Sequence, residues 1–405
     1  MPFEWTVAIR FLREGRLQSL LIVSGVGVGV GVIIFLSALI NGLQTSLIER
    51  TLGTQAHVVV RLPDEEPRTL VEDGQEVVAA TRVRPAQRPR SIVQWQQVEA
   101  LVDRQPDVTA SAPTVAGSAF ALRGAASRSV AVRGVDPVRY ERIVQIERYI
   151  TAGTFDLTGF EAVIGVELAR DLGASVGDKI RLAAAEGRGG PFTVTGIFDL
   201  GNKDLNQRWV FVSLRAAQTM FDLQGGISTI ELTVGHLFQA DKVAAAIAQR
   251  TGLEADSWMT LNSQLLVGLR SQSASSIMIQ VFVIVAVAFG IASVLAVSVV
   301  QKSREIGILR ATGTQTRQIL RVFLIQGALV GLAGSLLGIS LGAGLATFFA
   351  GLARNPDGSA TFPVDLNLWL FARSSLIATL VGLASAVLPA RRAARMDPVE
   401  VIRYG

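Results

Sequence analysis

Residues 17–48 read LQSLLIVSGVGVGVGVIIFLSALINGLQTSLI and contain no Asp, Glu, Lys or Arg. A helix needs about 20 apolar residues to cross the hydrocarbon core of a bilayer, and a buried helix of a soluble protein rarely needs so many. The stretch also far exceeds the ~7–15 apolar residues of a cleaved signal peptide. It therefore predicts a retained membrane-spanning helix.

Three further stretches have the same character. Residues 271–301 and 322–353 are free of charged side chains, and residues 368–389 contain only Arg373, which lies near one end beside Trp369. An arginine at that depth can reach the membrane interface, where tryptophan is also favoured. The sequence thus predicts four transmembrane helices.

The first two stretches are longer than a bilayer requires. A helix rises ~1.5 Å per residue, so each would extend for roughly 47 Å, whereas the hydrocarbon core is about 30 Å thick. We expect both helices to continue beyond the bilayer as stalks. The alternative is that each stretch includes an uncharged loop, for example at residues 271–273.

The composition agrees with a membrane protein and excludes several functional classes. Half of the 405 residues are hydrophobic and 18% are charged. There is no cysteine, which excludes thiol catalysis, and the two histidines leave little scope for imidazole metal ligation. The acidic run at residues 64–66 is typical of a solvated surface, and no HExxH, GxSxG or nucleotide-binding P-loop occurs. The sequence predicts neither a catalytic site nor a metal site.

The net charge of +5 comes from short segments beside the predicted membrane helices. Basic residues outnumber acidic ones before the first helix, between the second and third helices and in the C-terminal tail, whereas residues 49–270 hold slightly more acidic than basic residues. The positive-inside rule places the basic segments, and with them both termini, in the cytoplasm. Since the basic residues follow the membrane helices, no nucleic-acid partner is expected.

The fold class that follows is an α-helical integral membrane protein with four transmembrane helices and a large α/β extracytoplasmic domain between helices one and two. The predicted segments are a cytoplasmic N-terminal segment (1–16), transmembrane helix 1 with its stalk (17–48), the extracytoplasmic domain (49–270), a stalk with transmembrane helix 2 (271–301), a cytoplasmic loop (302–321), transmembrane helix 3 (322–353), a short external loop (354–367), transmembrane helix 4 (368–390) and a cytoplasmic tail (391–405).

Residues 49–270 mix strand and helix patterns. Residues 64–90 are rich in charge and proline and lack periodicity, which predicts a surface loop or a mobile insertion. Elsewhere we expect strands at 56–62, 129–135, 209–213 and 228–234, a strand running into a short helix at 161–172 that Gly173 caps, a hairpin beginning at 176 with a glycine-rich turn at 187–190, and a helix at 240–250.

Small residues repeat at every fourth position along two of the predicted membrane helices. Such spacing lets membrane helices approach closely, either within one chain or at a subunit interface. Four helices from one chain make a poor conduit, which favours a dimer. The candidate packing or dimer positions are Gly25 and Gly29 in the first helix, overlapped there by Gly27 and Gly31, and Gly334, Gly338 and Gly342 in the third.

The loop QKSREIGILRATGTQTRQILRVF (301–323) has a short amphipathic pattern, in which Ile306, Ile308 and Leu309 are flanked by charged residues and Gly313 ends the helix. A short helix with exposed apolar and charged side chains suits docking into a groove of another protein. An interfacial membrane helix would show the same pattern. No acidic residue or lysine lies deep in the membrane helices, so the energy for any transport would come from elsewhere.

Three stretches resemble the FtsX/MacB-type ABC transporter permeases. They are SREIGILRATG (303–313), GALVGLAGSLLGISLG (327–342) and LPARRAARMDPVEVIRYG (388–405). Other stretches are more similar to the LolC/LolE lipoprotein-releasing branch, and together the resemblance covers nearly the whole chain except the region of residues 64–90. These stretches are ALINGLQ (38–44), VRGVDP (132–137), VIGVELARDLGASVGDKIRL (163–182) and FTVTGIF (192–198).

The resemblance implies a permease subunit, without catalytic activity or a cofactor of its own, in the cytoplasmic (inner) membrane. A cytosolic ABC ATPase subunit would bind ATP and Mg²⁺, and a second permease copy or a paralogue would complete the membrane part. Lipoprotein or amphiphilic cargo would enter from membrane lipid between the first and second helices, and a periplasmic chaperone would receive it. The residues that match the family's ATPase-coupling helix are Arg304, Glu305, Ile306, Leu309, Arg310 and Gly313.

One departure from the lipoprotein-releasing branch concerns a hairpin. One permease of that branch carries a long hairpin that captures the chaperone, whereas the matching connection here, Ala183–Pro191, is short. Two alternatives stay open: a MacB-like efflux permease for small amphiphiles or peptides, and an FtsX-like mechanotransmitter that activates a cell-wall hydrolase. The resemblance fits them less well, because MacB proteins usually carry the ATPase in the same chain and the external domain of FtsX proteins is typically smaller.

Overall fold

The structure of the chain is a computed structural model that describes residues 3–63, 91–184, 187–352 and 364–396. The chain divides into two compact units. We call residues 1–48 and 267–405 the helical unit and residues 49–266 the α/β unit. The surface loop predicted at residues 64–90 lies outside the described residues.

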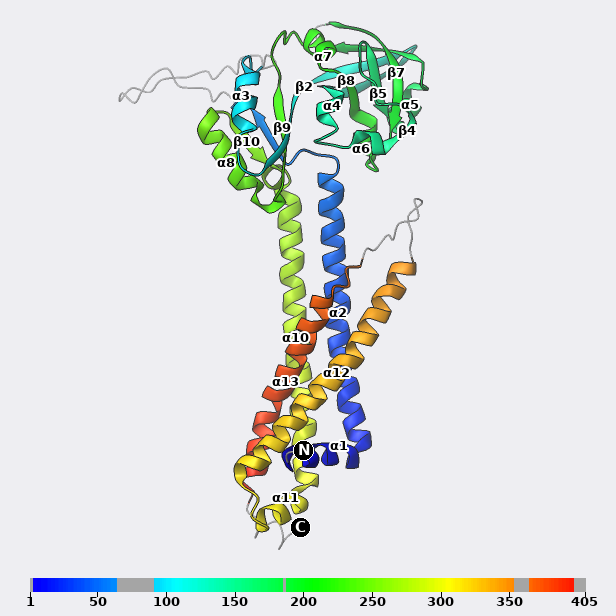
Figure 1. Cartoon of the computed structure of the whole chain (residues 1–405). Coiled ribbons are helices and arrows are strands. Elements are labelled where there is room, and N and C mark those ends of the chain that lie inside the picture. Colours follow the sequence, from blue (N-terminus) through cyan, green and yellow to red (C-terminus); the bar gives the residue numbers. More distant parts are fainter. Residues whose placement is uncertain (1–2, 64–90, 185–186, 353–363, 397–405) are drawn as a thin grey trace, which may run out of the picture. The chain divides into compact units, whose positions relative to one another are not determined.

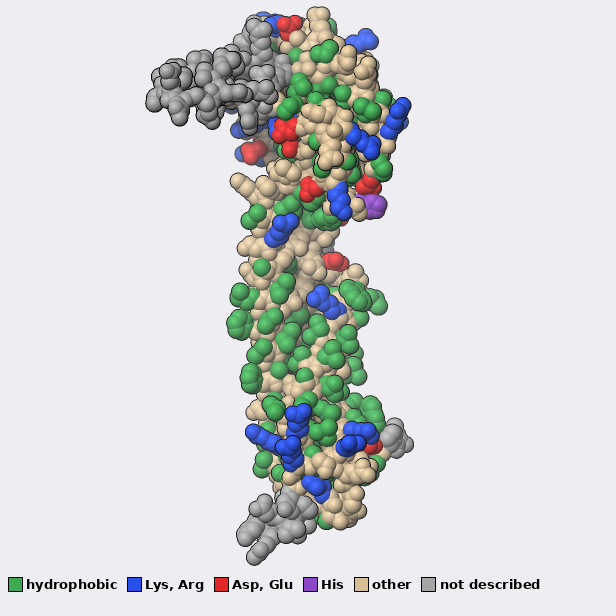
Figure 2. Space-filling view, turned by 90° about the vertical axis from the view of Figure 1, so that its left-hand side faces the viewer, with side chains coloured by type: hydrophobic (Ala, Val, Ile, Leu, Met, Phe, Trp, Pro, Cys, Tyr) green, Lys and Arg blue, Asp and Glu red, His purple; other side chains and the backbone are tan. Residues whose placement is uncertain are grey.

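In the part of the chain that the structure describes, four helices are long and apolar enough to cross a membrane, which confirms the predicted number. The space-filling view shows hydrophobic side chains along these helices and Lys and Arg side chains gathered at one end of the helical unit (Figure 2). The helices (Figure 1) are α1 (Phe3–Glu14), α2 (Arg16–Leu52), α10 (Ser263–Gln301), α11 (Ser303–Ala311), α12 (Thr316–Leu352) and α13 (Leu368–Ala394), of which α2, α10, α12 and α13 are the long ones.

The helices α2 and α10 are continuous well past the length of a bilayer span. They contain 37 and 39 residues, which corresponds to roughly 55 Å or more of helix against a hydrocarbon core of about 30 Å. The alternative of an uncharged loop at residues 271–273 is wrong, because these residues lie inside α10. Both helices are therefore long enough to extend beyond the membrane.

The α/β unit contains a sheet of ten strands, part of which closes into a barrel. The ring β2–β3–β8–β5–β7–β6 returns to β2, and the beginning of β2 continues the sheet through β9, β1 and β10. The strands are β1 (Val58–Arg61), β2 (Val108–Arg123), β3 (Ala126–Val135), β4 (Ile150–Gly153), β5 (Glu161–Gly165), β6 (Lys179–Ala184), β7 (Gly189–Phe198), β8 (Trp209–Ser213), β9 (Thr229–Val234) and β10 (Glu254–Ser257).

Short helices cover this sheet and connect its strands. The predicted strand-to-helix segment at 161–172 is confirmed as β5 followed by α5, and Gly173 ends α5 in the left-handed conformation, at φ +60°, that glycine adopts without strain. The helices are α3 (Trp95–Val102), α4 (Pro137–Tyr140), α5 (Val166–Leu172), α6 (Lys203–Arg208), α7 (Leu214–Met220), α8 (Ala240–Thr251) and α9 (Trp258–Leu261), with 3₁₀ turns η1 (Ile146–Tyr149) and η2 (Leu237–Gln239).

Strand β2 joins the barrel to the rest of the sheet, and a buried ion pair crosses it. Arg133 on β3 and Glu231 on β9 lie on opposite sides of β2 and form a salt bridge. The Arg133 guanidinium also lies 4.6 Å from the centroid of the Trp209 ring. Because a buried charge without a partner is costly, this pair favours one register of the three strands.

Candidate coupling site

The predicted short helix between the second and third membrane helices is α11. It begins directly after α10, and its end is defined by Gly313, whose φ of +100° lets the chain reverse before α12. The Thr314 amide donates a hydrogen bond to the Leu309 carbonyl at 3.1 Å, and the Gln315 amide donates to the Gln318 side chain at 2.9 Å. The connection is therefore a fixed turn with its own hydrogen bonds.

The inner face of α11 packs against the rest of the helical unit. Ile306 is 1% exposed and lies in an apolar cluster that draws on five helices. Leu309 is half-buried against the same cluster. We call this cluster the basal core: Ala8, Phe11, Val299, Ile306, Ile319, Val322, Phe323, Ala390, Ala393 and Ala394. Any force on α11 is thereby transmitted to α1, α10, α12 and α13 together.

Arg310 fastens α11 to the end of α13. Its Nη1 atom donates hydrogen bonds to the carbonyl oxygens of Ala394 and Met396, each at 2.8 Å. The last carbonyls of a helix have no partner within the helix, and a cation next to them is favourable. The predicted coupling residues Ile306 and Arg310 therefore lie on the side of α11 that faces its own chain.

The outer face of α11 carries a different set of side chains. Arg304, Glu305 and Ile308 are exposed, and Ile308 keeps 51% of its surface accessible. No ion pair involves the Arg304 guanidinium within the described residues. An unpaired cation beside an exposed branched apolar side chain is the type of surface that binds an acidic and apolar groove.

Lys302 links α11 to the N-terminal helix α1. Its Nζ atom lies 2.7 Å from Glu14 Oε2 and 2.7 Å from Glu305 Oε1, and 5.6 Å from the centroid of the Phe11 ring. Its hydrogen bonds to Glu14 and Glu305 raise the pKa of Lys302. Hydrogen bonds from Lys302 and Arg10 lower the pKa of Glu14. Lys302 and Glu14 are thus both charged at neutral pH.

Neither α1 nor Lys302 was among the predicted site residues. The sequence of α1, FEWTVAIRFLRE, buries Ala8 and Phe11 and exposes Trp5, which is the pattern of an amphipathic helix. In the sequence, this helix is indicated by the apolar residues Phe3, Val7, Ala8 and Phe11, which recur at helical spacing.

Replacement of Arg310 by Met is expected to destabilise the helical unit, because it removes two charge-assisted hydrogen bonds to the end of α13. We expect a loss of about 2 kcal/mol in the free energy of unfolding, since water can replace part of the lost bonding. The measurement is thermal unfolding of the purified full-length chain in detergent. Arg317→Met, at an exposed arginine on α12, is the control, and equal melting of the two variants would refute the role given to Arg310.

The glycines of the third membrane helix lie against the first. An added Cβ at Gly338 would lie 2.6 Å from the Val30 Cβ and 2.8 Å from the Gly27 carbonyl oxygen. One at Gly342 would lie 2.8 Å from the Gly31 carbonyl oxygen, and Gly334 faces Val26 in the same way. Within the described chain these three glycines of α12 therefore serve close packing against α2.

The two candidate glycines of α2 are placed differently. Gly29 faces Val287 of α10, whereas a Cβ at Gly25 would meet no atom within 4 Å among the described residues. The second small-residue contact lies between α12 and α13, where Gly327 meets Gly382 and Ala386. A small residue at every fourth position from Ala378 to Ala390 on α13 indicates this face in the sequence, although these positions were not among the predicted packing residues.

Polar side chains join α2 to α10 along their length. The Gln18 amide donates to the Val294 carbonyl at 3.1 Å, and the Gln44 amide donates to the Ser273 hydroxyl at 2.7 Å. Between them, the Gln280 amide donates to the Ser37 hydroxyl at 3.1 Å. Hydrogen bonds between membrane helices contribute about 0.6 kcal/mol each on average. We call this line of contacts between α2 and α10 the seam. Its hydrogen bonds fix how the two helices are aligned along their length, but they are weak enough for the helices to separate.

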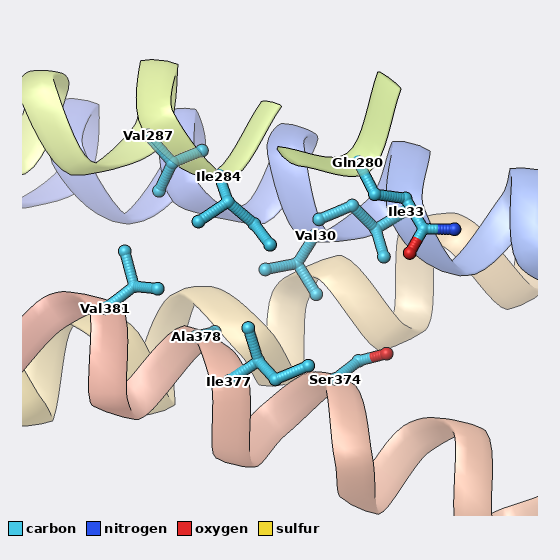
Figure 3. A pocket seen from close by; sticks show the side chains of 9 residues that line it. All are labelled: Val30, Ile33, Gln280, Ile284, Val287, Ser374, Ile377, Ala378 and Val381. Atoms are coloured by element: carbon cyan, nitrogen blue, oxygen red, sulfur yellow. The ribbon is translucent and has the colours of Figure 1, made fainter. Parts of the chain in front are cut away.

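A small cavity lies between α2, α10 and α13 (Figure 3). Its volume is about 40 Å³, which is room for only two or three water molecules. The cavity is lined by Val30, Ile33, Gln280, Ile284, Val287, Ser374, Ile377, Ala378 and Val381. The cavity is too small for any larger group unless the helices move apart.

Residues 19–250 match the family of the MacB-like periplasmic core domain, and residues 277–398 match the FtsX-like permease C-terminal family. The chain is similar to the lipoprotein-releasing system transmembrane protein LolC of Neisseria meningitidis, with 22% identity over 99% of both chains. It is similar to LolE of Haemophilus influenzae, with 25% identity over 93% of this chain and 92% of LolE. It is also similar to the macrolide export ATP-binding/permease protein MacB of Bordetella avium, with 26% identity over 97% of this chain and 59% of MacB.

Proposed function

This chain belongs to the FtsX/MacB-type ABC transporter permeases, and from that premise we propose that it extracts lipoproteins or other lipid-anchored cargo from the cytoplasmic membrane. It is a multi-pass membrane protein with a periplasmic domain and is the non-catalytic subunit of its transporter. The family implies a partner ATPase. The ATP and Mg²⁺ are bound by that partner, since the sequence contains no P-loop.

The observation that carries the cargo assignment is the extent of the similarity to LolC and LolE. The alignments with these proteins run over 92% or more of both chains, so the periplasmic domain and the membrane helices are matched together. The structure adds a seam between α2 and α10 that a few weak hydrogen bonds hold closed. In our proposal the lipid anchor of the cargo enters through this seam.

The proposed ATPase contact is the exposed face of α11, with Arg304, Glu305 and Ile308. Its inner face joins the basal core, so a movement of the ATPase would shift α10 and α12 at their ends. We place α11, α1 and both termini in the cytoplasm, because the Lys and Arg residues of the helical unit are concentrated in these segments.

A second permease copy or a paralogue completes the proposed transporter. Gly334, Gly338 and Gly342 pack within the chain, so we place the contact between subunits at Gly25, where an added Cβ would meet no described atom within 4 Å, and at the exposed face of α10. On α10, Phe282 is 68% exposed and Phe289 is 74% exposed.

Capture of a periplasmic chaperone by this chain is not part of the proposal. Strand β6 ends at Ala184 and strand β7 begins at Gly189, so the connection between them is short. In a heterodimer the paralogue would supply the chaperone contact.

The test is gentle purification of the full-length chain from its native membrane, followed by mass spectrometry of everything that remains bound. We expect an ABC ATPase together with acylated lipoproteins. The control variant Ile308→Asp should lose the ATPase and retain the lipoproteins. Recovery of the ATPase with a peptidoglycan hydrolase, or with small amphiphiles and no lipoprotein, would contradict the cargo assignment and favour the FtsX-like or the MacB-like alternative respectively.

A further inference from the structure

A cavity in the α/β unit carries a concentration of positively charged and hydrogen-bonding side chains. Its volume is about 380 Å³, within the range of small-molecule sites, about 300–1,000 Å³. Its walls come from the end of α2, from β2 and β9, and from residues 142–149, which follow α4 and include η1. These residues supply Arg142, Gln145, Arg148 and Tyr149.

The two arginines of the cavity have no ion-pair partner. Neither guanidinium forms a salt bridge within the described residues, and no carboxylate lines the cavity. Glu141 accepts a hydrogen bond from the Glu147 amide at 3.4 Å and interacts electrostatically with Arg148 without forming a salt bridge. Two guanidiniums that line one cavity, with neither of them in a salt bridge, favour an anionic ligand.

His57 and Thr233 add polar groups to the same cavity. His57 Nδ1 lies 3.0 Å from the Val234 amide nitrogen and 3.2 Å from the Val234 carbonyl oxygen, so the ring bonds to this backbone in either tautomer. Burial lowers the pKa of His57, so the ring is neutral at neutral pH. The Thr233 hydroxyl is buried and has no hydrogen-bond partner in the described structure. Within the described chain, the Thr233 hydroxyl is thus a donor that a ligand in the cavity can use.

We propose that this cavity binds a phosphate group, held by Arg142 and Arg148. A guanidinium forms bidentate hydrogen bonds to phosphate, and two of them match the charge of a phosphate better than that of a single carboxylate. The apolar side chains of Leu52, Ile143 and Val234 line the remaining wall, which suits a phosphate attached to a glycerol or acyl portion.

The source of the phosphate is either a lipid headgroup or a free anion. A lipid headgroup would reach the site as part of cargo that the transporter has extracted. This step rests on the proposed function, whereas phosphate binding itself does not require the ATPase.

The test is calorimetric titration of the purified full-length chain in an uncharged detergent, without ATPase. The probes are inorganic phosphate, dihexanoylphosphatidylglycerol, and dihexanoylglycerol as the probe without phosphate. We expect both phosphate probes to bind and dihexanoylglycerol to bind at least tenfold more weakly than the phospholipid. The double variant Arg142→Gln/Arg148→Gln should weaken phosphate binding at least tenfold. Arg215→Gln, at an exposed arginine outside the cavity, should not change it.

The relative affinities identify the source. A phospholipid that binds at least tenfold more tightly than inorganic phosphate supports a lipid headgroup, and equal affinities support a free anion. Unchanged binding in the double variant, or dihexanoylglycerol binding as tightly as the phospholipid, would overturn the proposal. If the Gln variant does not fold, Arg142→Lys/Arg148→Lys keeps the charge and should still lose affinity, because lysine cannot bind bidentately. Loss of the ATPase in the purification experiment would leave this binding result unaffected.

Discussion

A chain carrying Arg304→Glu is expected to fold and insert normally but to bind its ATPase at least 30-fold more weakly and to lose transport. Arg304 is exposed and forms no ion pair within the described chain, so its replacement breaks no ion pair there. In the complex with the ATPase, reversing the charge at position 304 would replace an electrostatic attraction between the two proteins by a repulsion. A loss of about 2 kcal/mol, typical of an interface hot spot, corresponds to this change in affinity.

Two substitutions in α11, at Ile308 and at Ile306, distinguish an effect on ATPase docking from an effect on folding. Ile308→Asp places a charge on the exposed face and should likewise remove the ATPase without lowering the melting temperature. Ile306→Asp buries a charge in the basal core, where Ile306 is 1% exposed, and should prevent the accumulation of folded protein. The measurements are recovery of the ATPase on the purified permease and thermal unfolding of each variant. ATPase binding by Arg304→Glu and Ile308→Asp at the level of the unchanged chain would contradict the assignment.

Leu309 is less useful as a test of docking. Its side chain is half-buried against the basal core. A charged replacement there would disturb packing as well as docking, and the two effects could not be separated.

A large effect on stability is also expected from Gly338→Leu. The backbones of α12 and α2 approach so closely at this residue that a single Cβ would already lie 2.6 Å from the Val30 Cβ. Overpacking by larger side chains costs about 1–3 kcal/mol and occasionally more, and here neither backbone can move without breaking the adjacent contacts at Gly334 and Gly342. We expect little folded protein in the membrane and a strongly lowered melting temperature.

Gly344→Leu is the matched control for that variant. Gly344 lies on the same helix and is exposed. Apart from its own helix backbone, an added Cβ at Gly344 would meet no described atom within 4 Å. The two variants share the change in hydrophobicity and in helix propensity. Equal expression and equal melting of Gly338→Leu and Gly344→Leu would show that the α2–α12 contact does not form in the membrane.

The membrane architecture could be predicted because its signal is local. A stretch without charged residues over the length of a bilayer is rare in a soluble protein. Helices α2, α10 and α12 coincide with such stretches, and α13 coincides with one that contains only Arg373 before its basic end. The turn at Gly313 was predictable for a similar reason, since a single glycine ends the amphipathic pattern of α11.

The closed barrel of the α/β unit could not be predicted in this way. Its central strand β2 has the sequence VTASAPTVAGSAFALR, which is rich in alanine and serine and contains a proline. Such residues have low strand propensity, and tertiary pairing with β3, β6 and β9 decides the structure instead. The pairing of distant strands leaves no signal in a single sequence.

The candidate site was only partly predictable for the same reason. The pattern around Ile306, Ile308 and Leu309 marks an amphipathic helix, but it does not say which side chain faces the protein. That depends on α1 and α13, whose contacts through Phe11 and Ala394 arise only in the fold. Likewise, the overlapping spacings Gly25/Gly29 and Gly27/Gly31 could not be distinguished until their partners on α12 were placed.

The central claim is that the outer face of α11 binds an ABC ATPase, and photo-crosslinking from position 308 in the native membrane tests it most directly. A photoreactive amino acid replaces Ile308 in one chain and Leu341, which is 50% exposed in the middle of α12, in a control chain. We expect position 308 to crosslink to an ABC ATPase, identified by mass spectrometry, and position 341 not to do so. Crosslinks from position 308 to lipid alone, in membranes that contain the ATPase, would contradict it.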